Sequence, residues 1–496
     1  MASPVQSTTA LLLAWGDTIK KHYVPGIFDK IARHGKTTRM LDIKERALDG
    51  IKIEYEIARF PNRGSSPSFD LMGAAPGHTP GAFDRFVLHF DHTDPANNDF
   101  MKLEVGLSTT YWDLKKKADS NFKGGSDFIA RDVAQAVDEV KEAMSRSFHL
   151  PSTGLVGTVA TSGKKNDDTF VFSTATTYTT GAATAFLKLD ATNMALLPEG
   201  QMIDIYTSGD APAILRARVT RVDPVDFTIH VEALSAAGNT TSSSVQNFDA
   251  VGNASKVYHM GGKDTAPKGN LAQLFNPTAT TGYFRDQNGA AINRTSKLHK
   301  QLYPHRVSNS GSAALLVESA WRAAGQTLAF RQGDGNAKLS RMVVMAQDGF
   351  NNMISMASGR PAGGASFTAA TVNRFIPALE SQIGGELMAA FGFDGYVYHD
   401  VNLGAVMAVV DDFAQYGFIR ILDRNDWEIT VPSSGGFDFL PADNGGIWHN
   451  QPGIDIGDLT GGPSLRYKAR GIMAYAYVCT APTNQCEIFN ILTTAT

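Results

Sequence analysis

Cysteine is almost absent from this sequence. The 496 residues include two, Cys479 and Cys486, close together near the C-terminal end. Two cysteines cannot cross-link a chain of this length, so a disulfide-stabilised secreted fold is excluded and a reducing compartment is favoured. A bond across a turn around Pro482 is conceivable from the spacing, but inert thiols in small apolar positions are the expected state.

Excess charge and long apolar runs are also lacking. Charged residues make up 19% of the chain, and 45 basic against 49 acidic side chains give a formal net charge of −4. This balance excludes a bulk electrostatic attraction to nucleic acid or to an anionic membrane. No window approaches about 18 consecutive apolar residues, and no basic residue precedes Leu11–Leu13, so we expect neither a membrane span nor a signal peptide.

What is present suits a large folded protein. Hydrophobic residues account for 43% of the chain, near the usual value of about 45–50%, and the length predicts about three domains. Residues 1–46 carry eight basic and four acidic side chains, a local charge of +4, with a break at Pro25-Gly26. We interpret this segment, which contains Trp15, as an arm that lies on another body.

An alternating pattern predicts a two-stranded ribbon after the arm. Apolar residues alternate with charged ones over 51–57 and return in alternation over 86–90, and residues 61–81 between them contain four glycines and four prolines. An isolated ribbon is marginal in water, so we expect this one to pack on a neighbouring subunit. The expected inter-subunit contacts are Ile51, Ile53, Tyr55, Ile57, Phe86, Leu88, Phe90 and Trp15.

The strongest helical pattern begins with Ser126 as N-cap and ends before Pro151. Its apolar residues recur at spacings of three and four, which places them on one buried stripe. The predicted core positions of this helix are Ile129, Val133, Val137, Val140, Met144 and Phe148.

Composition changes at Ser152, after which residues 152–262 are rich in Thr, Ser, Ala and Gly. Strand patterns there predict an inserted β-rich domain, with strands at 169–173, 202–206, 214–222 and 227–232. The remainder is mixed, which makes the fold class α+β. We expect helices at 312–330 and 370–384, and strands at 342–345, 406–410, 416–421, 427–431, 472–479 and 487–491.

Chemistry-bearing clusters are few and weak. His89, Asp91, His92 and Asp94 could converge on a metal ion, but alternate residues of a strand point to opposite faces, so we expect a solvated strand end. Asp411-Asp412 suits a turn or a subunit contact better than acid–base catalysis. The glycine-rich stretches lack the lysine and the strand-to-helix setting of a phosphate loop. We therefore predict no catalytic residue, no metal and no cofactor.

The order of these elements resembles the major capsid proteins of tailed bacteriophages. Two stretches are most similar to that family: EVGLSTTYWDL at 104–114, which leads into the long helix, and VVDDFAQYGFIRILDR at 409–424. The resemblance implies a shell subunit that assembles as hexamers and pentamers around double-stranded DNA. A tail or surface-fibre component, and a metal-dependent hydrolase using the His89–Asp94 cluster, remain as alternatives.

The resemblance also implies a division of the chain and a set of partners. The expected partners are many copies of the same chain, with portal, scaffolding or decoration proteins, weak non-specific contacts to packaged DNA and no membrane. The expected location is the virion, after assembly in the bacterial host cytoplasm. The implied segments are an N-terminal arm (1–46), an extended loop and following strand (47–113), a spine-helix region of a peripheral domain (114–151), the inserted β-rich domain (152–262), an axial α+β domain (263–431) and C-terminal strands returning to the peripheral domain (432–496).

Overall fold

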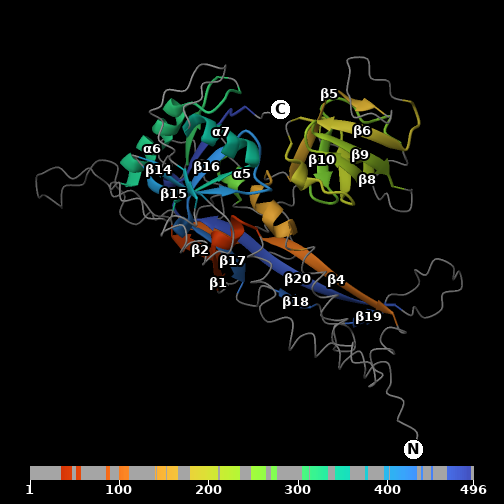
Figure 1. Ribbon diagram of the computed structural model, residues 1–496. Coiled ribbons are helices and arrows are strands. Elements are labelled where there is room, and N and C mark those ends of the chain that lie inside the picture. Colours follow the sequence, from red (N-terminus) through yellow and green to blue (C-terminus); the bar gives the residue numbers. More distant parts are fainter. Residues whose placement is uncertain are drawn as a thin grey trace, which may run out of the picture. The chain divides into compact units, whose positions relative to one another are not determined.

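The chain combines helices with several β-sheets and divides into two compact units, each described separately (Figure 1). Unit 1 draws its residues from Met1–Ile53, His89–Ser145 and Ile429–Ala476, and unit 2 from Glu54–Leu88, Arg146–Glu428 and Tyr477–Thr496. The computed structural model describes residues 35–46, 52–56, 85–89, 100–110, 140, 142–151, 154–165, 179–190, 192–209, 213–234, 247–263, 270–275, 304–311, 313–332, 341–357, 375–377, 396–400, 403–432, 437–439, 448–450 and 466–492.

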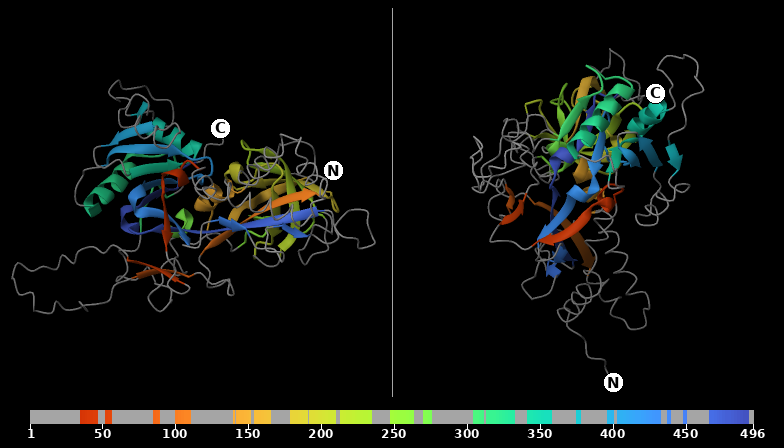
Figure 2. Two further views of the ribbon diagram at one scale, coloured as in Figure 1. Left: turned by 90° about the horizontal axis from the view of Figure 1, so that it is seen from below. Right: turned by 90° about the vertical axis from the view of Figure 1, so that its left-hand side faces the viewer.

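The sheet of unit 1 is built around one long strand, β20 (Arg466–Cys479). Strand β4 (Met101–Thr110) pairs antiparallel with β20 from Met101↔Tyr475 to Thr110↔Arg466, and the two strands lie side by side in all views (Figures 1 and 2). The sheet order is β1-β17-β20-β18, with β19 and β4 also paired to β20. The other bounds are η1 Thr38–Met40, β1 Asp42–Arg46, β17 Trp427–Pro432, β18 Phe437–Phe439 and β19 Trp448–Asn450.

Strand β1 comes from the segment that the sequence predicts to be an arm. It lies at the edge of the sheet, next to β17, and its sequence DIKER is mostly charged and exposed. Charged side chains on an edge strand oppose pairing with further strands. The end of the arm is therefore an ordered, protected sheet edge.

The predicted ribbon is present as β2 (Lys52–Glu56) and β3 (Arg85–His89), which form a two-stranded sheet of their own. Ile53, Tyr55 and Leu88 are buried in the single chain, at 3%, 6% and 0% exposure. Their contact with a neighbouring subunit stays a prediction. Ile51, Ile57, Phe90 and Trp15 lie outside the described residues, as does the side chain of Phe86.

Residues 155–259 of unit 2 fold into a closed antiparallel barrel with the strand order β10-β5-β6-β9-β8-β7. Leu215, Ala217 and Val219 of β8 point into the core while Arg218 between them is exposed, the alternation expected of a barrel wall. Closure leaves no free sheet edge. The bounds are β5 Leu155–Lys165, β6 Thr184–Leu189, η3 Met194–Leu196, β7 Met202–Tyr206, β8 Ala213–Asp223, β9 Thr228–Ala233 and β10 Lys256–His259.

The second sheet of unit 2 has seven strands in the order β11-β21-β16-β12-β15-β14-β13. Trp321 of α6 and Met353 of α7 are buried in one core with strand residues such as Val343 and Ile421. The bounds are α5 Leu271–Leu274, β11 His305–Ser308, α6 Glu318–Gln332, β12 Arg341–Met345, α7 Gln347–Ala357, β13 Phe375–Pro377, β14 Tyr396–Asp400, β15 Gly404–Val410, β16 Ile419–Asp423, η5 Arg424–Asp426, η6 Pro482–Asn484 and β21 Cys486–Phe489.

A buried charge triad crosses three strands of this sheet. The strand register places Glu487 of β21 opposite both Arg306 of β11 and Arg420 of β16. Glu487 Oε1 accepts hydrogen bonds from Arg306, and its Oε2 accepts one from Arg420 Nε, at 2.9 Å in each case. The Arg306 guanidinium also lies 4.5 Å from the centroid of the Phe489 ring. One carboxylate thus bridges two guanidinium groups, of which that of Arg420 is buried and that of Arg306 is partly exposed.

One predicted element needs correction. The helix expected at 370–384 is wrong at Phe375–Pro377, which is strand β13 and pairs antiparallel with β14, and Pro377 cannot donate a helical hydrogen bond. The two strands expected on either side of Pro482 are present as β20 and β21; they belong to different sheets, and η6 lies between them. Both cysteines are free and buried.

Candidate functional site: the base of the inserted barrel

Both ends of the barrel segment are tied to the end of one helix. The helix is described at residue 140 and over 142–149, and Pro151 follows it. Val140, Met144 and Phe148 are buried; Ile129, Val133, Val137 and Ser126 lie outside the described residues. Chain entry and exit are adjacent, because Leu155 at the start of β5 pairs with Tyr258 near the end of β10.

Asn270 fixes the returning chain to this helix end. Its Nδ2 donates to the carbonyl oxygens of Ser147 at 3.1 Å and Leu150 at 2.5 Å, and its Oδ1 accepts from Gln273 N as the N-cap of α5. The last carbonyls of a helix have no partner within the helix. Asn270 therefore caps two chain segments at once and holds the two ends of the insertion together.

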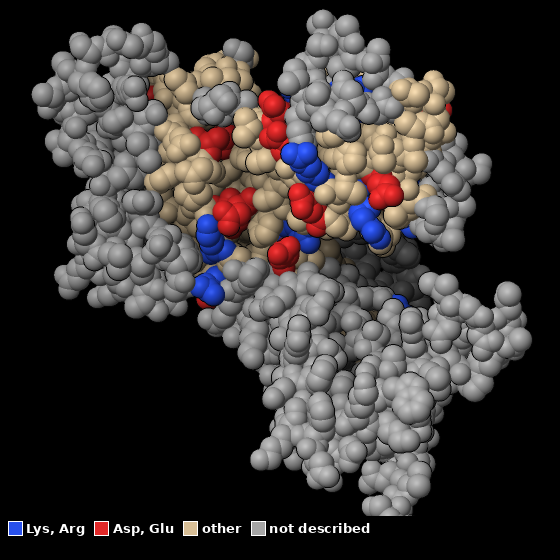
Figure 3. Space-filling model, turned by 45° about the vertical axis from the view of Figure 1, so that its right-hand side comes forward, with Lys and Arg blue, Asp and Glu red and all other residues tan. Residues whose placement is uncertain are grey.

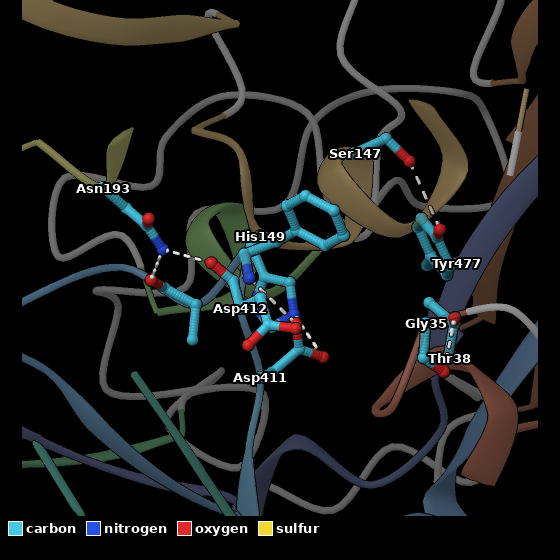
Figure 4. A network of polar contacts seen from close by, with 10 residues as sticks. Gly35, Thr38, Ser147, His149, Asn193, Asp411, Asp412 and Tyr477 are labelled. Carbon is cyan, nitrogen blue, oxygen red and sulfur yellow. Dashed lines mark hydrogen bonds and ion pairs between the residues drawn. The ribbon is translucent and has the colours of Figure 1, made fainter. Parts of the chain in front are cut away.

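Asn193, just before η3, makes the corresponding link from the barrel to the loop after β15 (Figure 4). Its Nδ2 donates to Asp412 O at 2.7 Å and Ala414 O at 2.6 Å, while its Oδ1 accepts from Ala195 N at 3.0 Å. Phe413 packs against the barrel core between these two carbonyls. One buried asparagine thus aligns a barrel loop with residues 412–414.

His149 and Asp411 form a buried pair at the same place (Figure 4). His149 Nε2 lies 3.3 Å from Asp411 Oδ2, and their side chains are 1% and 3% exposed. Asp411 Oδ1 accepts the backbone N–H of Phe413 at 3.0 Å, which fixes the carboxylate. The pair therefore places the end of the helix against the turn that follows β15.

Arg146 and His259 complete the base of the barrel. Arg146 Nη1 donates to Gln201 Oε1 at 3.1 Å, and His259 Nε2 donates to the Leu196 carbonyl at 2.6 Å. Burial, aided by the positive charge of Arg146, lowers the pKa of His259 to about 4. A histidine with this pKa is neutral at neutral pH, and here it serves as a hydrogen-bond donor.

The chemistry of the site is that of positioning. The side chains of Asn193, Asn270 and Asp411 hold backbone groups, and all three are buried. Among the described residues, no group of three or more His, Cys, Asp and Glu is arranged to hold a metal ion. In the same part of the chain, no helix is long and apolar enough to cross a membrane.

The predicted residues contribute to this site unevenly. Asp411 and Asp412 form a turn after β15, as expected, and take part through a carboxylate and a carbonyl. His89 ends β3, and Asp91, His92 and Asp94 lie outside the described residues. Sequence reasoning missed Asn193 and Asn270, although an asparagine directly before a short apolar helical turn is an N-cap signal.

No protein-family model and no curated protein sequence matches the chain. Among solved structures, it is similar to a chain of the cyanophage A-1(L) capsid asymmetric unit, with 10% identity, a TM-score of 0.38 and coverage of 92% of this chain and 93% of that one.

Two further similar chains come from Mycobacterium phage Patience and from the procapsid of satellite phage P4. The first is 10% identical with a TM-score of 0.34, covering 99% of this chain and 95% of the other. The second is 10% identical with a TM-score of 0.32, covering 96% and 93%.

Proposed function

We propose that this chain is the major capsid protein of a tailed bacteriophage, a structural subunit without catalytic turnover. Hexamers and pentamers of it would form an icosahedral shell around double-stranded DNA. Its place would be the virion, after assembly in the host cytoplasm.

The observation that carries the proposal is the path of the chain. An N-terminal strand at a sheet edge, a ribbon with a sheet of its own, strand β4, a helix ending before Pro151, a barrel, a seven-stranded sheet with helices and a return through β20 follow one another in that order. The pairing of β4 with β20 brings the segment after the ribbon beside the C-terminal strand. In the division that the resemblance implies, β20 belongs to the C-terminal strands of the peripheral domain. Six strands of the seven-stranded sheet fall in the axial segment 263–431, and β21 falls in the C-terminal segment.

The distribution of charge supports the same function. Acidic and basic side chains are interspersed on the described surface seen in Figure 3, and the net charge of the chain is −4. A container for DNA needs an inner face that does not grip phosphates, since each phosphate contact adds salt-dependent affinity. A shell subunit also meets several copies of itself, and mixed charges allow polar contacts with each of them.

Electron microscopy of the purified chain tests the proposal. We expect hexamers, pentamers or closed shells in negative stain, with matching particle masses from light scattering. The chain should be examined alone and after co-expression with a scaffolding protein, which shells of this kind can require. A monodisperse monomer in both samples would contradict the proposal.

The expected partners belong to the same proposal. Copies of the chain would be the main partner, and portal, scaffolding or decoration proteins the others. Contacts with DNA would be weak and non-specific. Metal analysis and hydrolysis assays on the purified chain would test the absence of enzymatic activity, because a metal-dependent hydrolase would lose both metal and activity when His89 and His92 are replaced.

A further inference from the structure

Asp426 lies where two turns of unit 2, η5 and η6, are joined by hydrogen bonds. It is separate from the residues that form the base of the barrel. It ends the turn η5, which connects β16 to β17. Its Oδ2 accepts hydrogen bonds from Asn484 Nδ2 at 2.9 Å and Gln485 Nε2 at 3.0 Å. Its carbonyl accepts the backbone N–H of Thr480 at 2.8 Å. One residue thus ties η5 to the segment that contains η6.

Gln485 completes this link from the other side. It is fully buried, and its Oε1 accepts from the backbone N–H of Asp423 at 2.9 Å and from Trp427 Nε1 at 3.2 Å. We call the set Asp423, Asp426, Trp427, Thr480, Asn484 and Gln485 the clasp. The chain passes from unit 2 to unit 1 within β17 and returns within β20, so the clasp adjoins both connections in the sequence.

The hydrogen bonds that the Asp426 carboxylate accepts bring it no counter-charge, because their donors are the uncharged amides of Asn484 and Gln485. Two titratable groups that act on it are the carboxylate of Asp423, which repels it, and the thiol of Cys479. Arg341 is attracted to Asp423, which its strand register places opposite, and Arg424 lies on the same turn as Asp426.

The protonation equilibrium follows from this environment. Burial raises the pKa of Asp426 to about 7, the charge of Asp423 adds to the effect, and the amides of Asn484 and Gln485 oppose it. A neutral carboxyl keeps both amide contacts without placing a charge at this partly buried position.

We propose that Asp426 is a proton-operated closure: the clasp is held firmly while the carboxyl is neutral and opens more readily once the carboxyl ionises. The change falls near neutral pH, where an ordinary aspartate is always charged. This property belongs to the fold of unit 2 and stands independently of the proposed shell function, so failure of either leaves the other intact.

Native-state hydrogen exchange on the full chain measures this opening. The reporters are the backbone amides of Asp423, Thr480 and Gln485, with rates corrected for the intrinsic effect of pH. In the open clasp Asp426 regains its ordinary pKa, so opening releases a proton. We expect the opening constant to rise about tenfold per pH unit from pH 5 and to level off near pH 7. A constant value from pH 5 to pH 8 would overturn the proposal.

Three variants sharpen the test. Asp426→Asn should make opening independent of pH, because no carboxyl remains to titrate. Asn484→Ala removes a donor that favours the charged form of Asp426, so the opening constant should stop rising at a higher pH than in the unmodified chain. Asp423→Asn removes a repelling charge, so the opening constant should stop rising at a lower pH. If Asp426→Asn does not fold, these two variants suffice, and shifts in the same direction would refute the mechanism.

Discussion

Glu487 pairs with both Arg306 and Arg420 across three strands of the seven-stranded sheet. Replacing it with Gln leaves Arg306 and Arg420 without a counter-charge, and Arg420 is 4% exposed in its side chain. Breaking a buried pair in this way typically costs about 3–5 kcal/mol of unfolding free energy. We expect Glu487→Gln to lose stability of that order in urea denaturation.

The matched control for this prediction is the exposed pair Glu318 and Arg322 on α6. Their side chains are 50% and 63% exposed, and the contact spans one helical turn. An exposed pair of this kind contributes at most about 0.5 kcal/mol. Glu318→Gln should therefore leave the midpoint nearly unchanged, and equal losses from the two substitutions would contradict the role given to Glu487.

His259 predicts a pH response of the barrel that is opposite in sign to that of the clasp. Its pKa in the folded chain is about 4, below the ordinary value of 6.5. As the pH falls below 6.5, His259 takes up a proton in the unfolded chain but stays neutral in the folded chain. The stability that is present above pH 6.5 is therefore lost progressively as the pH falls toward 4. The full loss is at most about 3 kcal/mol.

Hydrogen exchange of β7 and β10 checks the response of His259. Between pH 7 and pH 4.5 the protection of these strands should fall, and His259→Gln, which can still donate to the Leu196 carbonyl, should flatten the profile. If the protection of β7 and β10 in the unmodified chain stayed constant, protonation of the His259 ring would not destabilise the folded barrel, and the prediction would be wrong.

At the scale of elements, some strands of the barrel and of the seven-stranded sheet are readable from the sequence, because alternation fixes which face is buried. Six others are not predicted as strands: β5, β6, β10, β11, β13 and β14. β7 is predicted at its observed bounds, and β8 and β9 to within one residue at each end. Which strands pair is not readable, since closure of the barrel depends on contacts between β10 and its partners β5 and β7.

Helix α7 is an element that could not be predicted from local sequence patterns. Its sequence QDGFNNMISMA contains a glycine and two asparagines, which are weak helix formers, and no helix is predicted there. Asn352 has a tertiary role: its Nδ2 donates to Asp348 O and Leu492 O, and its Oδ1 accepts from Leu316 N. Tertiary hydrogen bonds therefore select a residue that local propensity disfavours, and the same explains why Asn193 and Asn270 carry no obvious functional signal.

The link between barrel and loop 412–414 gives a prediction at this scale. Asn193→Ala leaves the carbonyls of Asp412 and Ala414 without their donor, a cost of roughly 1–3 kcal/mol for each group that stays buried and unpaired. Exchange of the amides in residues 411–416 should accelerate at least tenfold. Asn253→Ala is the control, because the Asn253 side chain accepts a hydrogen bond from Ser162 N at an exposed position of the barrel. If Asn253→Ala accelerated the exchange of residues 411–416 as much as Asn193→Ala does, the role given to Asn193 would be contradicted.

For the whole molecule, the question is which segments stabilise the folded chain and which serve contacts between copies of it. The core clusters of the barrel and of the seven-stranded sheet are each filled by residues of unit 2 alone. The ribbon β2–β3 joins neither larger sheet, and it brackets residues 61–81, which are rich in Gly and Pro. We therefore expect the ribbon to serve contacts between copies of the chain.

Shortening that segment separates the two roles. We expect a chain in which residues 61–81 are replaced by a four-residue Gly-Ser linker to keep the thermal unfolding midpoint of the unmodified chain, because a shorter loop changes closure entropy only slightly. The same variant should fail to form shells in electron microscopy, since the reach of the ribbon toward a neighbour is lost. Normal shells would assign the contacts between copies to other surfaces, whereas a large fall in the unfolding midpoint would mean that the segment belongs to the fold itself.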